Sequence, residues 1–273
     1  MTITITNTAT DAETARAAAR AGAAVVRDMF GASLDRFDKG AGDFATAADL
    51  AAEQAILDVL RAARPDDAVT GEEAGQLGRA DARRRWLVDP LCGTLNYAVR
   101  NLLVAVNVAL RTGSDITAAA AADPFTDEVF WTDGERAWLR TGDQDEPLVP
   151  SADSRLVDLN LDPPFPNAPG FRAARLLTEP AFVERFRPRV VSTTLAVAWV
   201  AAGRRAAYVT DGHLDDSVHF AAGIALCRSA GCVVTGIHGQ PLHTGAGGLL
   251  VAADQETHAA LLDMVNRQRP DLP

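Results

Sequence analysis

The stretch Trp86–Tyr97 constrains the fold of this chain more than any other. Residues 86–88 are apolar and follow three consecutive arginines, a pattern typical of the end of a buried strand. Asp89 and Pro90 are expected to stop this strand, because proline has no N–H group for the ladder. Residues 92–94 (Cys-Gly-Thr) predict a tight turn that opens a helix, and such a turn offers backbone N–H groups to a phosphate or another anion. A carboxylate, a thiol and a hydroxyl therefore cluster at a strand end, where sites are common in α/β folds.

The composition is that of a globular protein with a sizeable core. The chain has 273 residues, of which 48% are hydrophobic and 23% charged. A net charge of −10 argues against nucleic acid and anionic membranes as main partners. No apolar run reaches the ~20 residues that span a bilayer, and the first residues do not resemble a secretory signal. Three widely spaced cysteines do not suggest a disulfide framework, so we expect a reducing cytoplasm.

The pattern of apolar runs predicts two halves with strands and helices in both. Residues 102–139 alternate apolar runs with turn signals, as in an antiparallel meander, although the alanines at 118–122 fit a helix equally well. Residues 141–170 are rich in Pro, Asp and Ser and read as a connection. We therefore expect an N-terminal sub-domain over 1–145 and a C-terminal one over 146–273, joined in one integrated fold. In the second half the patterns predict strands at 172–177, 205–209, 232–236 and 249–252, and helices at 181–186, 193–202 and after Ser217.

Two acidic positions in the first half have a structural and a functional interpretation. Thr46 and Asp49 have the spacing of a helix-capping box, and capping is the simpler explanation for both. Glu72 and Glu73 end a short predicted strand, and adjacent side chains on a strand face opposite ways. At most one of these two glutamates can therefore point into a given site.

These segments resemble the signatures of the inositol monophosphatase family. The segment from Asp89 to Tyr97 is similar to its Asp-Pro-(Ile/Leu)-Asp-Gly-Thr-x-Asn-Phe motif, with Cys92 at the second aspartate. Gly-Glu-Glu at 71–73 is similar to its second signature, and residues 218–223 (Val-His-Phe-Ala-Ala-Gly) are similar to its Trp-Asp-x-Ala-Ala-Gly, with His219 at the aspartate. The resemblance extends over about residues 10–255. It implies an α/β (α+β layered) fold, an alternating α-β-α-β-α sandwich, and a homodimer.

The resemblance also implies roles for individual residues. Family enzymes hydrolyse phosphomonoesters with two or three Mg²⁺. Glu72, Asp89 and the Leu91 carbonyl would hold a first ion, and Gly93 and Thr94 would bind the phosphate. Lys39, the only lysine of the chain, and Asp49 match positions near the metal site. Because Mg²⁺ prefers oxygen ligands, Cys92 and His219 are expected to cost the second position most of its Mg²⁺ affinity.

Three hypotheses follow for the site, and the first two assume a small-molecule substrate. In the first, Asp89, Cys92 and His219 bind a softer ion such as Zn²⁺ or Fe²⁺. In the second, no metal is needed, and Cys92 is a nucleophile with His219 as its base and Thr94 helping to stabilise an oxyanion. In the third, the chain is a non-catalytic relative of the enzymes.

The Cys92–His219 pairing favours a repurposed enzyme acting on a small, possibly phosphorylated, metabolite. A metal-dependent phosphomonoesterase is the alternative. Asp215 and Asp216 could restore a carboxylate to the site, although capping of the following helix together with Ser217 explains them more simply.

Overall fold

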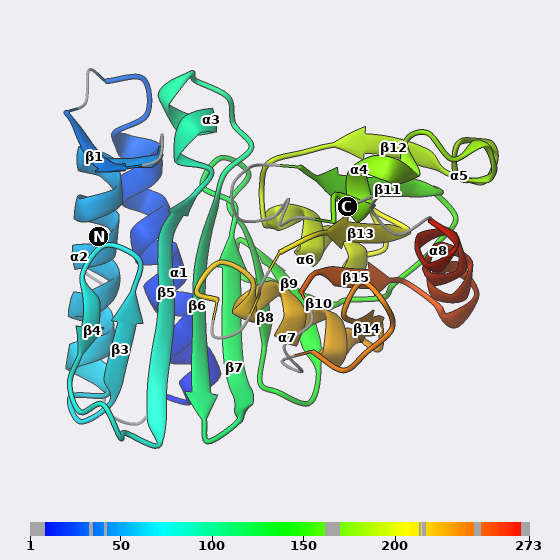
Figure 1. Ribbon diagram of the computed structural model, residues 1–273. Coiled ribbons are helices and arrows are strands. Elements are labelled where there is room, and N and C mark those ends of the chain that lie inside the picture. The colour runs from blue at the N-terminus through cyan, green and yellow to red at the C-terminus, as the bar shows by residue number, and fades with distance from the viewer. Residues whose placement is uncertain are drawn as a thin grey trace. The chain divides into compact units, whose positions relative to one another are not determined.

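The computed structural model describes residues 9–32, 35–40, 43–161, 170–212, 214, 217–242 and 247–268. The chain divides into two compact units (Figure 1). Unit 1 contains residues 1–147 together with two later segments, Thr193–Leu195 and Ser217–Leu226. Unit 2 contains Leu148–Ser192, Ala196–Asp216 and Cys227–Pro273. The two later segments bring Thr194 and His219 into the unit that carries Asp89.

Unit 1 is built on an eight-stranded sheet with the strand order β10-β9-β8-β7-β6-β5-β3-β4. All neighbouring strands are antiparallel except β3 and β5, which are parallel. The predicted meander is confirmed, and the alanines at 118–122 lie in a strand. The strands of the sheet are β3 (Ala68–Gly71), β4 (Gly75–Leu77), β5 (Arg84–Cys92), β6 (Ala105–Thr112), β7 (Asp115–Ala122), β8 (Glu128–Thr132), β9 (Ala137–Thr141) and β10 (Gln144–Pro147).

Helices α1 (Asp11–Asp28) and α2 (Ala47–Ala63) cover one face of this sheet (Figure 1). Both begin with a capping box, in which Thr10 pairs with Glu13 and Thr46 with Asp49. The capping role expected of Thr46 and Asp49 is therefore confirmed. The opposite face of the sheet packs against the first turns of α7 (Ala221–Ala230) through small residues such as Ala222. A two-stranded hairpin, β1 (Arg36–Gly40) and β2 (Asp43–Thr46), precedes α2, and the short helix α3 (Thr94–Ala98) follows β5.

Strand β5 does not stop at Asp89 and Pro90, so that prediction was wrong. It runs on to Cys92 and pairs with β6, with a register shift between Asp89 and Cys92. Such a bulge takes the proline out of the ladder, which is how a strand accommodates a residue without an N–H group. The alternation along β5 places Trp86 and Val88 in the core beneath α1 and α2, and Leu87 on the opposite face.

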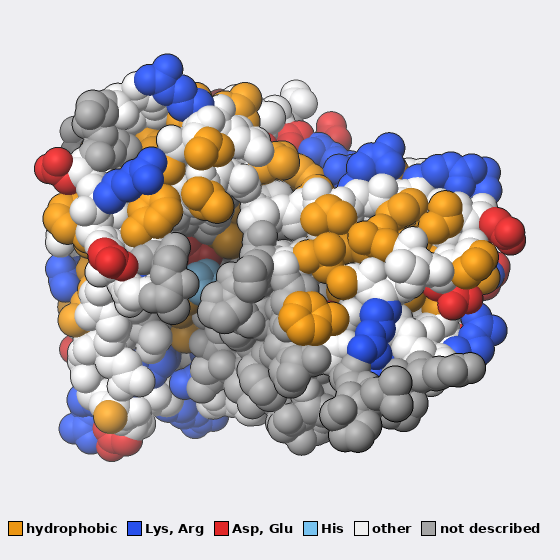
Figure 2. Space-filling model, turned by 45° about the horizontal axis from the view of Figure 1, so that its top comes forward, with side chains coloured by type: hydrophobic (Ala, Val, Ile, Leu, Met, Phe, Trp, Pro, Cys, Tyr) orange, Lys and Arg blue, Asp and Glu red, His pale blue; other side chains and the backbone are white. Residues whose placement is uncertain are grey.

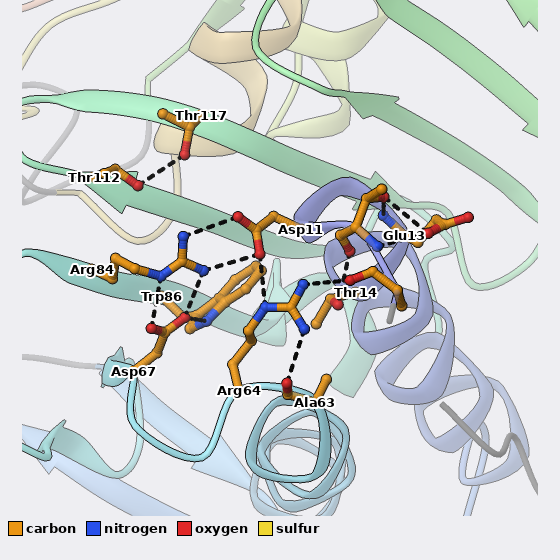
Figure 3. A network of polar contacts seen from close by, with 12 residues as sticks. Asp11, Glu13, Thr14, Ala63, Arg64, Asp67, Arg84, Trp86, Thr112 and Thr117 are labelled. Atoms are coloured by element: carbon orange, nitrogen blue, oxygen red, sulfur yellow. Dashed lines mark hydrogen bonds and ion pairs between the residues drawn. The ribbon is translucent and has the colours of Figure 1, made fainter. Parts of the chain in front are cut away.

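The first residues of β5 are tied to α1 by a network of charged groups (Figure 3). Arg84 donates to both carboxylate oxygens of Asp11, at 3.0 Å each, and to both of Asp67, at 2.8 and 2.9 Å. The Trp86 indole donates to Asp67 at 3.0 Å, and Arg64 donates to Asp11 at 2.8 Å. Bidentate guanidinium–carboxylate pairs fix orientation as well as position, so this network fixes the start of α1 relative to the start of β5.

Unit 2 has a five-stranded mixed sheet in the order β12-β11-β13-β15-β14. Its strands are β11 (Leu156–Asn160), β12 (Arg187–Val190), β13 (Ala207–Thr210), β14 (Val233–Thr235) and β15 (Leu249–Ala252). Apolar residues of α4 (Arg172–Leu176), α5 (Pro180–Arg185) and α8 (Gln255–Arg267) pack on this sheet. Helix α6 (Leu195–Ala201) completes the described helices. Layered helices and mixed sheets confirm the predicted α/β (α+β) class.

The strand expected at 172–177 is instead α4, so that prediction was wrong. The buried Asp211 carboxylate accepts hydrogen bonds from the backbone N–H groups of Arg172 (2.9 Å) and Ala173 (2.8 Å). A carboxylate on the first N–H groups of a helix stabilises its start, and this partner comes from a distant strand end. A local pattern could not reveal it.

Several large apolar side chains of unit 1 are exposed around α3 and β1, among them Leu95, Val99, Leu102 and Phe37. Figure 2 shows hydrophobic and basic side chains together over this end of the unit. Across the described ranges, none of the helices combines the length and the apolar character needed to cross a membrane.

Candidate active site

Four of the predicted site residues lie together in unit 1. Asp89 and Cys92 belong to β5, Glu72 directly follows β3, and His219 lies in the turn before α7. Because β3 and β5 are parallel neighbours, Glu72 continues beside β5, and its N–H group donates to the Val88 carbonyl at 3.0 Å. Sheet pairing thus explains why residues 72 and 89 meet.

His219 is held by Asp89 and lies beside Cys92. The distance from His219 Nδ1 to Asp89 Oδ2 is 2.8 Å, and to Glu72 Oε2 it is 4.0 Å. One potential ligand atom from each of Asp89, Cys92 and His219 lies within 4.8 Å of the other two. Asp89 is wholly buried, whereas the His219 side chain is 35% exposed and Cys92 is half-buried. A small ligand can therefore approach this cluster from the side of the imidazole and the thiol.

Glu72 is positioned by residues on two sides. The buried Glu53 carboxylate of α2 accepts hydrogen bonds from the N–H groups of Glu73 (3.1 Å) and Ala74 (2.7 Å), which fixes the turn after β3. From the β1–β2 hairpin, Lys39 Nζ lies 3.0 Å from Glu72 Oε1 and also pairs with Glu73. Lys39 thus forms an ion pair with one of the site residues, Glu72.

The residues of the predicted phosphate cradle have other partners. The Thr94 hydroxyl hydrogen-bonds with Asp49 Oδ1 (3.0 Å) and with the Leu91 carbonyl (3.2 Å). Gly93 has a φ of 101° and leads into α3, and a Cβ there would lie 2.9 Å from the Leu103 carbonyl, so this position needs glycine. Asp49 accepts from Thr46 and Thr94 through both of its oxygens, so it braces the turn after β5. Asp49 and Thr94 link α2 to the strand that carries the cluster.

Burial and neighbouring charges shift the pKa values of all four groups of the cluster. Burial and the neighbouring Asp89 raise the pKa of Glu72 to about 8. Burial and Asp89 also raise the pKa of the Cys92 thiol. Burial alone would lower the pKa of His219, but the Asp89 carboxylate outweighs it and holds that pKa well above its usual value. The same pairing with the imidazolium outweighs burial at Asp89 and lowers the pKa of its carboxyl group.

The donor set fits one borderline metal ion better than a pair of Mg²⁺ ions. Glu72 Oε2 and Asp89 Oδ1 are buried and receive no N–H or hydroxyl donor from the described residues, which is unusual for carboxylate oxygens. A proton on Glu72 lets the two carboxyl groups hydrogen-bond with each other. A carboxylate, a thiol and an imidazole are a plausible set for Zn²⁺, with one position left open. Mg²⁺ requires oxygen donors, and the Cys92 thiol and the His219 imidazole are not oxygen donors.

Three residues that hold the site residues in place were not predicted from the sequence. Asn107 lies opposite Asp89 in the β5–β6 register, and its amide nitrogen is 3.4 Å from Asp89 Oδ2 and 2.9 Å from Thr194 Oγ1. Thr194 also contacts the Cys92 thiol. Glu53 is the third. A lone amide in the apolar run 102–110 was the available signal for Asn107, but nothing local marks Thr194 or Glu53.

The expectations for Asp215 and Asp216 fall outside the described residues. The Ser217 hydroxyl, expected to cap the next helix, is buried without a hydrogen-bond partner in the described part of the chain. That prediction was wrong, because the cap requires a hydroxyl that accepts from the first helical N–H groups.

The chain is similar to known proteins over most of its length. The chain is 34% identical to the inositol-1-monophosphatase of Caulobacter vibrioides over 263 residues, covering 92% of this chain and 97% of that protein. It is 30% identical to the Nus factor SuhB of Escherichia coli, covering 85% and 86% of the two chains.

Among solved structures, the extragenic suppressor protein suhB of Bartonella henselae matches with a TM-score of 0.79 at 28% identity, covering 92% of this chain and 96% of that one. The inositol monophosphatase of Anabaena matches with a TM-score of 0.74 at 25% identity, covering 95% and 96%. The sequence model of the inositol monophosphatase family matches residues 7–269. The chain belongs to the inositol monophosphatase family.

Proposed function

We propose that this protein hydrolyses small phosphomonoesters at a site where Asp89, Cys92 and His219 hold one Zn²⁺-like ion. The observation that carries the proposal is the convergence of three potential ligand atoms within 4.8 Å, beside buried oxygens of Asp89 and Glu72 that receive no N–H or hydroxyl donor from the described residues. Family membership and relatives named inositol-1-monophosphatase support the substrate class. In this assignment, Cys92 and His219 are metal ligands at the two positions where the family motifs have aspartates.

The chemistry of the site divides between the ion and the chain. A bound ion of this kind supplies Lewis-acid polarisation of a phosphoryl oxygen. Asp89 orients the His219 ring through the 2.8 Å contact at Nδ1, while Asn107 and Thr194 hold Asp89 and Cys92 in place. Glu72, with its pKa raised to about 8, is suited to hold or release a proton near neutral pH.

A second candidate function is a metal-free Cys92–His219–Asp89 triad. The favouring observation is that His219 contacts Asp89 on one side and hydrogen-bonds with the Cys92 thiol, the order of groups in a nucleophile–base–carboxylate relay. The raised pKa of the thiol argues against it, because a cysteine nucleophile needs a lowered pKa. Thr94 is also committed to Asp49 and Leu91, which weakens its predicted role toward an oxyanion.

A non-catalytic role is the third candidate and is motivated by relatives named Nus factor. The homodimer and the cytoplasmic location inferred from the sequence remain predictions.

The deciding experiment measures metal content and phosphatase activity on the same samples. The purified protein is analysed for bound elements, then chelated and reloaded separately with Zn²⁺, Fe²⁺ and Mg²⁺. Phosphate release is followed on a panel of inositol and sugar monophosphates. Cys92→Ala and His219→Ala test the proposed ligands, and Cys232→Ala is the matched cysteine control, since Cys232 lies in unit 2.

We expect near-stoichiometric Zn or Fe in the wild-type protein and in Cys232→Ala, and its loss in the other two variants, together with loss of turnover. Retention of the metal in Cys92→Ala and His219→Ala would overturn the ligand assignment. Turnover that needs Mg²⁺ and survives both substitutions would restore the ordinary phosphatase. Absence of metal combined with thiol-dependent activity would favour the triad.

A further inference from the structure

Two cysteines meet where helix α7 ends in unit 2. Cys227 lies in the last turns of α7 (Ala221–Ala230), and Cys232 precedes β14 (Figure 1). Both are free thiols, and neither takes part in the candidate active site. Their spacing alone would suggest two unrelated small residues.

The backbone at this helix end forms a Schellman turn that aligns the two cysteines. Gly231 has a φ of 90°, and its N–H group donates to the Arg228 carbonyl at 3.1 Å. The Cys232 N–H group donates to the Cys227 carbonyl at 2.9 Å. These two bonds are the pair that defines the motif, and the residues joined by the longer-range bond commonly bring their side chains together. Here those residues are Cys227 and Cys232.

The thiols are in contact but differ in exposure. A side-chain hydrogen bond joins them. Cys227 is wholly buried, and its Sγ also donates to the Val197 carbonyl at 3.1 Å, whereas Cys232 is partly exposed. A solute can therefore reach Cys232 first, with Cys227 waiting beside it.

We propose that Cys232 and Cys227 form a peroxide-responsive dithiol, a modification site separate from the active site. In the first step, the Cys232 thiolate attacks one oxygen of a hydroperoxide, the O–O bond breaks, and Cys232 becomes a sulfenic acid while the peroxide is reduced to water or an alcohol. In the second step, the Cys227 sulfur attacks the Cys232 sulfur, its proton leaves with the hydroxyl as water, and a disulfide forms. The pair loses two electrons in total, and the peroxide gains them.

The placement of the pair suits this order of events. An accessible thiol next to a resolving one is the arrangement of redox-sensing cysteines, and disulfides of intracellular proteins are mostly transient ones of this kind. The new bond would close a short loop around Gly231 and lock the C-terminal turn of α7 covalently. A thiol reductant would reverse it.

Trypsin provides a direct test, because it cleaves after Arg228, between the two cysteines. In the reduced protein, residues 206–228 and 229–267 separate as two peptides. The folded wild-type protein is exposed to hydrogen peroxide, the remaining thiols are alkylated, and the digest is analysed by mass spectrometry with and without reductant. Cys227→Ser and Cys232→Ser are treated in parallel, with circular dichroism to verify their folding.

We expect the two wild-type peptides to remain linked, lighter by two hydrogens than their sum, and to separate on reduction. Cys227→Ser should carry the sulfenic acid, or its further oxidation products, on Cys232. Cys232→Ser should keep Cys227 largely reduced. Sulfinic or sulfonic acid on wild-type Cys232 without the link, or both thiols still free, would overturn the proposal.

Discussion

The two ends of strand β5 hold their charged groups in opposite ways. At the start of the strand, Arg84 donates to all four carboxylate oxygens of Asp11 and Asp67, and these carboxylates receive further bonds from Arg64 and Trp86. Arg84 and then Arg64 outweigh burial at Asp11 and lower the pKa of its carboxyl group.

At the far end, two carboxylates share one imidazole, and one oxygen on each receives no N–H or hydroxyl donor from the described residues. Burial and a neighbouring like charge raise the pKa of Glu72 there. The same strand thus carries two charge clusters. In the completed one, at the start of β5, every carboxylate oxygen has a partner in the protein, whereas in the incomplete one, at the end of β5, two carboxylate oxygens lack a donor. A buried carboxylate oxygen without a donor costs stability, so a chain that retains two of them is suited to a ligand that completes the cluster.

The largest expected effect is on activity at the incomplete end. Asp89→Asn removes the negative charge that orients His219. The same substitution also removes a proposed metal ligand. We expect kcat/KM for phosphomonoester hydrolysis to fall on the order of 10³-fold, the scale of losing a group that acts in proton transfer or metal binding. Steady-state kinetics on the metal-loaded enzyme measures it. Asp115→Asn, an exposed carboxylate of β7, is the control and should leave kcat/KM unchanged. Full activity of Asp89→Asn would show that the Asp89 charge is not needed at the site.

The next largest effect is on stability at the completed end. Arg84→Met leaves the carboxylates of Asp11 and Asp67 without their shared cation. We expect the free energy of unfolding to fall by about 2–3 kcal/mol, the scale for hydrogen bonds to charged groups. Urea unfolding checks it, and the exposed neighbour Arg83→Met should cost less than about 0.5 kcal/mol. If both variants unfold alike, the network of Figure 3 has no special role in stability.

The residues of the incomplete end could be predicted from the sequence, whereas the network at the start of β5 could not. The capping box at Thr46 is a local pattern, and it was predicted. Glu72, Asp89, Cys92 and His219 were predicted through the resemblance to the family, and the structure brings them together. Local patterns cannot do this, since residues 89 and 219 meet only through tertiary packing.

What escaped depends on partners far away in the chain. The bulge in β5 is set by pairing with β6, and α4 begins on a carboxylate from the end of β13. Asn107 was one polar residue in an apolar run, and only the strand register shows that it faces Asp89. The protonation of Glu72 follows from burial, which no residue type encodes by itself.

The two ends should also respond oppositely to pH. Glu72 binds its proton more tightly when folded. Its contribution to the free energy of unfolding is therefore fully present below its ordinary pKa of 4.5 and is lost as the pH rises through about 8. His219 also has a raised pKa, so its contribution is fully present below its ordinary pKa of 6.5 and is lost as the pH rises above that value. Asp11 acts oppositely, because its lowered pKa gives stability that is present above 3.8 and lost as the pH falls.

We therefore expect the metal-free protein to lose stability between about pH 5 and pH 8, and Glu72→Gln to flatten this slope. Thermal unfolding of the chelated protein across this range measures it. An identical slope in wild-type and Glu72→Gln would show that Glu72 ionises normally. Arg84→Met should leave the slope unchanged in this window, because Asp11 titrates below it.

The smallest effect concerns Lys39, which joins the β1–β2 hairpin to the incomplete end. The pair with Glu72 is partly exposed, so Lys39→Met should cost less than about 1 kcal/mol of stability. The more specific consequence of this substitution is electrostatic, because the Lys39 charge lowers the pKa of Glu72. Removing the charge should shift the pH profile of kcat/KM upward by roughly a few tenths of a unit, the size expected for a screened contact. Lys39→Arg keeps the charge and should restore the wild-type profile. A profile that moves equally in both variants would mean that hairpin geometry, and not charge, couples Lys39 to Glu72.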